Sequence, residues 1–587
     1  MSQFIKFVLA SVIGIIIGLG LLFFIVVGIM GALSDTKPSI NEKSVLKLDF
    51  SNSIPELTNN VATSPFDFEQ VNTVGLHKTI ALIENAATDD KIKGILIKNN
   101  STGGGFATMS SIRKALLTFK ESDKFVYAYS DYYSQGAYYL ASVADSIFLN
   151  PQGMADVKGF AVLSPYFKEA LDEIGVKMNV FYAGDFKSAT EPFRRNEMSE
   201  ENRLQTTEFL ESMATNYISD VAASRNMTYE KLDQVMAEYA GGNAKGCLES
   251  GLVDKLAYFD ELEDVIKSNI GIEADDKIEY VSIDKYNQVA YISKNGKAKD
   301  KIAIIYAEGE IQYNSKEKGL ISEKKYASIL KEIENADDIK AVVLRVNSPG
   351  GNSLSSDIIW HGIEEIKASG KPVVASFGDY AASGGYYISA GADTIVSEKN
   401  TLTGSIGVFM MIPDASTLVD DKLGINFDEV KTHPMAVPIT PFKPLDEREK
   451  QYLQQTTNDI YDTFISRVAE GRNMDRASVE KIAQGRVWTG EKAQELGLVD
   501  VIGDLDKAIE IAAEMADSED YKLSIYPEIE ETFLDQFVKG LKSTDQISSS
   551  IGIDKKELAY IKEYRKLKSF ISDLSPQARL PFEVSFD

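Results

Sequence analysis

A long internal repeat constrains this chain more than any other feature, and its two copies differ at one polar position. The segment Asp131–Tyr139 reads DYYSQGAYY and Asp379–Tyr387 reads DYAASGGYY, an offset of 379 − 131 = 248 positions. The first copy has Gln135 where the second has Ser383. A nucleophilic hydroxyl is therefore present at this position in only one of the two copies.

The repeat covers much of the chain. Gly94–Gly104 matches Ala341–Gly351, and Gly251–Asp254 matches Gly497–Asp500. Solenoid units are only roughly 20–50 residues long, so this spacing indicates a duplicated domain. Duplication for size alone would not explain why the copies differ at a candidate chemical position.

Each copy alternates predicted strands with predicted helices, which favours parallel sheets covered by helices. The predicted strands are 45–50, 95–97 and 125–129 in the first copy and 302–306, 342–346 and 372–377 in the second, and the predicted helices are 79–87, 109–119, 326–336 and 356–368. We therefore predict an α/β fold that occurs twice in tandem.

The pattern divides the chain of 587 residues into five parts. They are a membrane anchor with a short tether (1–43), a first repeat (44–270), a linker (271–300), a second repeat (301–520) and a C-terminal extension (521–587). The extension has no evident partner in the first repeat. Its Phe533, Phe537 and Leu541 recur at near-helical spacing, which is typical of packing or assembly.

The overall charge excludes one class of partner. A net charge of −26 and a pI of about 4.7 argue against nucleic acid, which requires basic surfaces. Cys247 is the only cysteine, so neither an intramolecular disulfide nor a thiolate zinc cluster is possible.

The N-terminal segment from Phe7 to Leu33 contains no charged residue. As a helix it would exceed the roughly 30 Å hydrocarbon core of a bilayer. A cleaved signal peptide is the alternative, but its apolar stretch is usually only about 7–15 residues. The flanking charges weakly favour the amino end inside and the body outside, which in a Gram-negative cell means the periplasm.

Ser383 lies in a setting that suits a nucleophile. It follows a predicted strand, has Ala382 and Gly384 as neighbours, and precedes an apolar helical run. Small neighbours admit a substrate carbonyl, and a helix start presents free N–H groups and a positive dipole end. The alternative is an ordinary N-cap serine, which is common.

Two glycines are candidate donors to an oxyanion. Gly351 ends the turn Asn347-Ser348-Pro349-Gly350-Gly351, and Gly384 follows the candidate nucleophile. Backbone N–H groups of such residues can hold an oxyanion. A Ser-Pro-Gly-Gly stretch is otherwise an ordinary turn, and no Gly-Lys-Ser/Thr follows it, so it is not a phosphate-binding loop.

The base is predicted to be a lysine. The three histidines, His77, His361 and His433, lie in no catalytic-histidine motif. Lys187 lies in the stretch Gly184-Asp185-Phe186-Lys187-Ser188-Ala189-Thr190-Glu191-Pro192-Phe193, and the second copy has Ala436 at the matching place, counted back from Pro441-Phe442. A lysine base needs its pKa lowered from about 10.4 to about 7–8, which requires burial.

An apolar surround for Lys187 is predicted from Phe181, Tyr182, Phe186 and Phe193, with Asp185 turned away from the amine. The alternative is a solvated surface lysine, the usual position of this residue type.

These residues together resemble a known family. The paired repeats, the stretch around Lys187 and the stretch around Ser383 are similar to the long form of signal peptide peptidase A in peptidase family S49. The resemblance covers the chain from the N-terminal segment to about Ala512. It implies a Ser-Lys dyad, a fold like that of the Clp protease and crotonase, a homotetramer and, by motif, Ser405 as the residue that orients the lysine.

The resemblance further implies a membrane-anchored endopeptidase of the inner membrane that degrades remnant signal peptides and requires no cofactor or metal. Two alternatives stay open at this level. One is a crotonase-type acyl-CoA enzyme, which shares the oxyanion architecture, and the other is a non-catalytic membrane scaffold.

Overall fold

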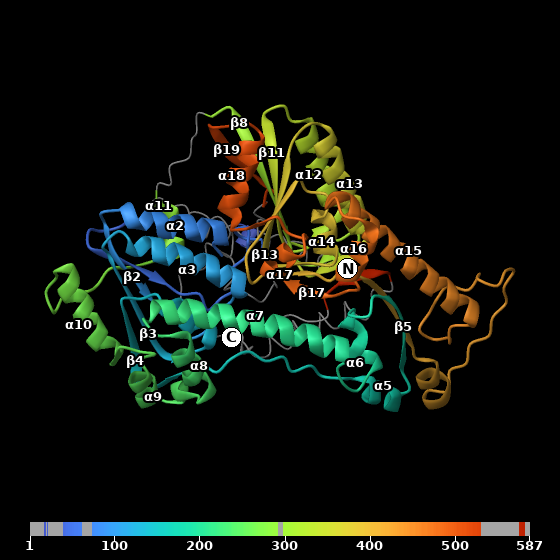
Figure 1. Cartoon of the computed structure of the whole chain (residues 1–587), viewed down its shortest axis with the longest axis horizontal. Helices are drawn as coiled ribbons and strands as arrows, with labels where there is room; N and C mark the ends of the chain where they lie inside the picture. The colour runs from blue at the N-terminus through green and yellow to red at the C-terminus, as the bar shows by residue number, and fades with distance from the viewer. Residues whose placement is uncertain are drawn as a thin grey trace, which may run out of the picture.

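Two large α/β units lie side by side (Figure 1), each built on its own sheet, and a third sheet takes strands from both repeats. The architecture comes from a computed structural model, which describes residues 14, 17, 18, 20, 39–60, 73–290, 298–529 and 575–580. The N-terminal segment predicted to be an anchor, 7–33, lies outside the described residues except for four positions. Among the helices of the described residues, none is both long and apolar enough to span a membrane.

The first repeat is built on a sheet whose strands all run parallel. Its strands, in spatial order, are β6 (Lys255–Leu256), β4 (Ser146–Ala155), β3 (Phe125–Tyr133), β2 (Ile92–Ile97), β1 (Ser44–Leu48) and β7 (Tyr280–Ser282). Its helices include α2 (Leu76–Thr88), α3 (Phe106–Lys120), α4 (Gln135–Ala141), α7 (Glu200–Ser224), α8 (Tyr229–Ala237), α9 (Ala244–Ser250) and α10 (Phe259–Ile270).

The second repeat has the same plan. The main path of its sheet is β17 (Val487–Thr489), β15 (Leu402–Gly404), β13 (Val373–Ala382), β11 (Ile339–Ser348), β8 (Asp300–Glu308) and β19 (Tyr521–Tyr526), with β14 (Thr394–Ser397) and β18 (Val501–Ile502) attached to it. Its helices include α12 (Glu323–Asn335), α13 (Ser353–Ala368), α14 (Gly384–Ser389), α15 (Glu447–Gly471), α16 (Arg476–Ile482), α17 (Gly490–Glu495) and α18 (Leu505–Met515).

The central strands are continuous apolar runs because helices cover both faces of a parallel sheet. Val342, Val343 and Leu344 in β11 are fully buried, and so are the aliphatic residues of β2. The predicted tandem α/β organisation is therefore confirmed, and the strands and helices predicted in each copy lie within or beside observed ones.

Two predicted boundaries need correction. The stretch predicted as a linker, 271–300, contributes β7, which pairs with β1, and the helix α11 (Ile283–Val289). The extension likewise begins with β19, which pairs with β8 in the matching edge position. The start of the extension, β19, therefore has a counterpart in β7. The sequence did not reveal this because the two strands share a position in the sheet and no strong motif. Phe533, Phe537 and Leu541 lie outside the described residues.

The third sheet joins distant parts of the chain. Its order is β10 (Ile321–Ser322), β9 (Ile311–Gln312), β12 (Gly350–Asn352), β20 (Gln577–Arg579), β16 (Val408–Asp414) and β5 (Lys177–Ala183). β5 belongs to the first repeat and runs antiparallel to β16 of the second, with Ala183 opposite Val408. This crossing carries the segment after β5 into the second repeat.

Buried polar contacts also hold the repeats together. Arg345 on β11 forms a two-pronged ion pair with Glu56 of the first repeat, at 2.9 and 3.0 Å, and both side chains are buried. Asp379 of the second repeat accepts hydrogen bonds from the N–H of Gly105 (3.0 Å) and of Thr108 (2.8 Å) at the start of α3. A carboxylate at a helix N-terminus is stabilising, so the serine-bearing loop is anchored on the first repeat.

Candidate active site

Ser383 lies at the junction of β13 and α14 in a strained backbone conformation. Its φ is +55° and its ψ is −113°, a combination that non-glycine residues rarely adopt. Its N–H donates to the carbonyl of Gly404 (2.8 Å), and its carbonyl accepts from the N–H of Tyr387 (2.8 Å). Although Ser383 occupies the N-cap position, its side chain makes no capping hydrogen bond. The interpretation as an ordinary capping serine is therefore wrong.

The Lys187 amine is buried against this hydroxyl. Its Nζ lies 2.8 Å from Ser383 Oγ, although the two residues are 196 positions apart. It also contacts the carbonyl and the Oγ of Ser405, both at 3.0 Å. Only 1% of Lys187 is exposed, and burial lowers the pKa of its amine well below the usual range.

A loop of the second repeat holds the segment that carries Lys187 in place. The N–H of Phe186 donates to the carbonyl of Gln484 (2.8 Å). A Cβ on Gly485 would lie 2.7 Å from the Lys187 Cβ, so only glycine, here with a φ of +76°, admits the lysine backbone. β5 on one side and the 484–486 loop on the other therefore fix the direction of Lys187.

The predicted surround of the amine is partly corrected. Tyr182 is exposed, with the Arg194 guanidinium over its ring, and the ring of Phe186 lies under Arg486. Asp185 is exposed, as an uncharged amine requires. Lys187 is buried because the two repeats pack closely around it, and not because aromatic side chains of its own segment surround the amine.

Ser405 lies beside the Lys187 amine. It follows β15 with a φ of +50°, and its N–H donates to the carbonyl of Arg486 (2.7 Å). The 484–486 loop thus contacts both the segment of Lys187 and that of Ser405.

The two predicted donor glycines lie next to each other. A Cβ on Gly384 would lie 3.1 Å from the backbone nitrogen of Gly351, and a Cβ on Gly350 would lie 2.8 Å from that of Gly384. Side chains at these positions would fill the space between the two N–H groups. Because these glycines have no side chains, the carbonyl oxygen of Ala578 fits close to the two backbone nitrogens.

Gln205 is a contributor that the sequence did not reveal. This α7 side chain donates to the carbonyl of Phe186 (3.1 Å) and to Ser188 Oγ (3.0 Å), and it accepts from the N–H of Val487 (3.0 Å). It ties the segment of Lys187 to β17. A single glutamine in a helical run carries no motif that could have identified it.

The histidines have no part in this arrangement. His77 contacts Asp506 at 3.0 Å, and His361 and His433 are exposed. This agrees with the prediction that the base is not a histidine.

Comparison with known proteins gives the same class of chemistry. The sequence pattern of Peptidase family S49 matches residues 118–273 and 365–519. Protease 4 of Haemophilus influenzae is 36% identical over 442 residues, which are 74% of this chain and 72% of that protein. The chloroplastic serine protease SPPA of Arabidopsis thaliana is 32% identical over 73% of this chain and 64% of its own length.

Among solved structures, a ClpP1 mutant from Listeria monocytogenes aligns with 35% of this chain and 94% of its own at 15% identity, with a TM-score of 0.24. That similarity is too weak to carry an argument, so the likeness to the Clp protease and crotonase fold stays a prediction. The family match, in contrast, covers a large part of both repeats. The chain belongs to peptidase family S49 and is a serine protease.

Proposed function

We propose that Ser383 is the nucleophile of this protease and that Lys187 is its general base. The observation that carries the proposal is the distance of 2.8 Å between the Lys187 amine and the Ser383 hydroxyl, with the amine shielded from solvent. Burial favours the uncharged amine, and only that form can accept a proton from serine.

The contacts supply a role for each hydrogen of the neutral amine. Two N–H bonds point to the carbonyl and the Oγ of Ser405, which leaves the nitrogen lone pair for the Ser383 hydroxyl. Ser405 thus orients the base without being part of the bond-making step.

The reaction then proceeds by acyl transfer. Lys187 takes the proton of Ser383, whose Oγ attacks a peptide carbonyl, and the N–H groups of Gly351 and Gly384 stabilise the oxyanion. The protonated amine gives its proton to the leaving nitrogen, and an acyl-enzyme forms. Water, activated by the same amine, releases the acyl group. Every step uses groups of the chain and water, so we assign no cofactor.

For the substrates we propose remnant signal peptides. We further propose that the protein cleaves them at the periplasmic side of the inner membrane and that it acts as a homotetramer. The support is the resemblance to signal peptide peptidase A together with the uncharged segment 7–33, which is long enough to hold the site near a bilayer. The family assignment favours this function over a crotonase-type acyl-CoA enzyme or a non-catalytic scaffold.

The test is hydrolysis of a fluorogenic peptide by full-length protein in detergent, compared between wild type, Ser383→Ala and Lys187→Ala. Both variants should lose at least about a thousandfold in kcat/KM, while the circular dichroism spectrum is unchanged. Ser134→Ala is the matched control. It removes the hydroxyl next to Gln135, in the first-repeat loop that is equivalent to the Ser383 loop, and should keep activity near that of wild type. Near-full activity of either dyad variant would refute the assignment.

The substrate and the location need separate measurements. Signal peptides should be cleaved faster than soluble peptides of the same length when both are presented in vesicles. Fractionation should place the protein in the inner membrane, and mass measurement in detergent should give four chains. Cleavage of soluble peptides alone would leave the dyad intact and remove the proposed substrate.

A further inference from the structure

The strained backbone of Ser383 has to be held by its surroundings, because such a conformation persists only where the neighbouring structure enforces it. The strand that leads to it is paired on both sides, since Ala381 of β13 lies opposite Ser348 of β11 and Thr403 of β15. Asp379 lies in the same strand, four positions before the serine. A displacement at Asp379 would therefore be transmitted to Ser383.

The Asp379 carboxylate accepts three hydrogen bonds from the start of α3 in the first repeat. Its Oδ2 accepts from the N–H of Gly105 (3.0 Å) and from the Thr108 hydroxyl (2.7 Å), and its Oδ1 accepts from the N–H of Thr108 (2.8 Å). Only 9% of Asp379 is exposed. Burial raises the pKa of its carboxyl group, and the donors on α3 oppose that shift. The buried carboxylate is thus stabilised by the other repeat.

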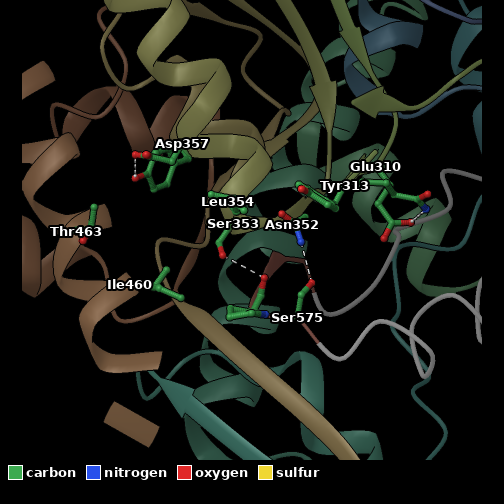
Figure 2. Close-up of a pocket in the computed structure, with 12 residues that line it drawn as sticks. Glu310, Tyr313, Asn352, Ser353, Leu354, Asp357, Ile460, Thr463 and Ser575 are labelled. Atoms are coloured by element: carbon green, nitrogen blue, oxygen red, sulfur yellow. Dashed lines mark hydrogen bonds between the residues drawn. The ribbon is translucent and has the colours of Figure 1, made fainter. Parts of the chain in front are cut away.

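The equivalent helix of the second repeat begins differently. Asn352 corresponds to Gly105, with 352 − 105 = 247 positions between them, and its side chain caps α13 by accepting from the N–H of Ser355 (2.9 Å). Asn352 lies at the start of α13, on the edge of the cavity drawn in Figure 2. Gly105 has no side chain that could cap α3, and a Cβ there would lie 2.5 Å from the Asp379 Cγ. The first repeat thus receives this helix cap from the strand that leads to the nucleophile.

The residue that corresponds to Asp379 in the first repeat has its partners within that repeat. Asp131 is exposed, and its Oδ1 accepts from the Tyr129 hydroxyl (3.1 Å) and from the Asn150 amide (2.9 Å). The same residue type at equivalent places therefore joins the two repeats on the side that carries Ser383 and serves its own repeat on the other.

We propose that Asp379 is a positioning residue for the nucleophile. By holding β13 on the N-terminus of α3, it fixes the Ser383 hydroxyl within reach of the Lys187 amine. The proposal rests on the Ser-Lys function proposed above. It matters for the rate because a displacement of about 1 Å at the reacting atoms can cost roughly a hundredfold. Packing of the first repeat thus acts on the reaction twice, by supplying the base and by aligning the serine.

The first experiment measures kcat, KM and the rate of labelling by a serine-directed phosphonate, using full-length protein in detergent. Asp379→Ala should lower kcat and the labelling rate at least about tenfold, with KM changed less than about twofold, because alignment and not peptide binding is lost. Asp379→Asn keeps one acceptor oxygen for α3 and should lie between Asp379→Ala and wild type. Asp131→Ala is the matched control and should keep the wild-type kcat.

The second experiment separates alignment from helix capping. The double variant Asp379→Ala/Gly105→Asn gives α3 the residue type that caps α13, and the alanine removes the Cγ and Oδ1 that a side chain at position 105 would meet first. This variant should regain Tm relative to Asp379→Ala and keep the low kcat. Thr228→Ala, which removes the cap of α8, should lower Tm and leave kcat unchanged.

Three outcomes would overturn one proposal or the other. A wild-type kcat in Asp379→Ala, or recovery of kcat together with Tm in the double variant, would overturn the positioning role alone. Wild-type protein that hydrolyses no peptide and is not labelled at Ser383 would instead overturn the Ser-Lys function on which the positioning role rests.

Discussion

The loops at Gln135 and Ser383 occupy the same place in the two repeats but treat their polar groups differently. In the first repeat, Ser134 caps α4 by accepting from the N–H of Ala137, and Gln135 Oε1 accepts from the N–H groups of Lys158 (3.1 Å) and Gly159 (2.8 Å). In the second, the Ser383 hydroxyl meets an amine from the other repeat. One loop satisfies its polar groups internally, and the other leaves a hydroxyl available for chemistry.

A second pair of equivalent positions shows the same division. Arg345 on β11 corresponds to Lys98, with 345 − 98 = 247 positions between them. Arg345 is buried and pairs with Glu56 of the first repeat, whereas the Lys98 amine lies over the Phe259 ring of its own repeat, 3.4 Å from its centroid. The second repeat thus uses for contact between repeats a position that the first uses locally.

Exchange of the loop residues is expected to have the largest effect. Ser383→Gln, which gives the second loop the residue of the first, should lower kcat/KM at least about a thousandfold because no nucleophile remains. Gln135→Ser should keep catalytic activity and lower stability by about 1–3 kcal/mol, because two partly buried hydrogen bonds, from the N–H groups of Lys158 and Gly159, are lost. Labelling with a serine-directed phosphonate provides the readout. A new labelled site at position 135 would contradict the comparison.

The next largest effect is expected on stability, when the charge at Arg345 or at the equivalent Lys98 is removed. Arg345→Met should destabilise the protein by about 3–5 kcal/mol, since it leaves the buried Glu56 carboxyl group without its cationic partner. Lys98→Met should cost less than about 1 kcal/mol, the scale of an exposed cation–ring contact. Thermal unfolding of both variants at one pH tests this. Equal shifts in Tm would show that the Arg345–Glu56 pair stabilises the protein no more than the Lys98–Phe259 contact does.

A smaller effect on activity is expected at Ser405. Ser405→Ala removes one hydroxyl acceptor of the Lys187 amine but keeps the carbonyl, a loss of about 0.5–1.5 kcal/mol, or up to roughly tenfold in kcat. Val157→Ala at the equivalent position of the first repeat should lower Tm and leave kcat unchanged. A Ser405→Ala variant with a wild-type kcat would exclude the Ser405 hydroxyl as a group that orients the lysine.

The smallest expected effect is a pH-dependent difference in Tm between Lys187→Met and wild type. The folded-state pKa of Lys187 is lowered by burial, so the unfolded chain binds the extra proton between this pKa and about 10.4. Burial of the uncharged amine therefore lowers the free energy of unfolding of wild type, and this loss becomes smaller as the pH rises toward about 10.4. The Tm of Lys187→Met minus the Tm of wild type should therefore fall with rising pH. A difference that is constant or that grows would indicate a charged amine in the folded protein.

The sequence was informative where a property depends on a short segment. The duplication, the strand–helix alternation and the tight, small-residue turn at Ser383 follow from local pattern, and the resemblance pointed to Lys187 and Ser405. Gln205, Gly485 and Gln484 could not be identified in this way. Their roles depend on contacts across the two repeats, and none of them has a distinctive neighbourhood in the sequence.

By itself, the sequence determined that there are two related α/β units and that a serine occurs in one of them and a lysine in the other. Only the tertiary structure decided that these groups meet, because it is the pairing of β5 with β16 that carries Lys187 to Ser383 across 196 positions. The structure also decided that the amine is buried and that the C-terminal segment lies in the third sheet. Segment preferences act over a few residues, whereas burial and reactivity depend on which distant surfaces pack together.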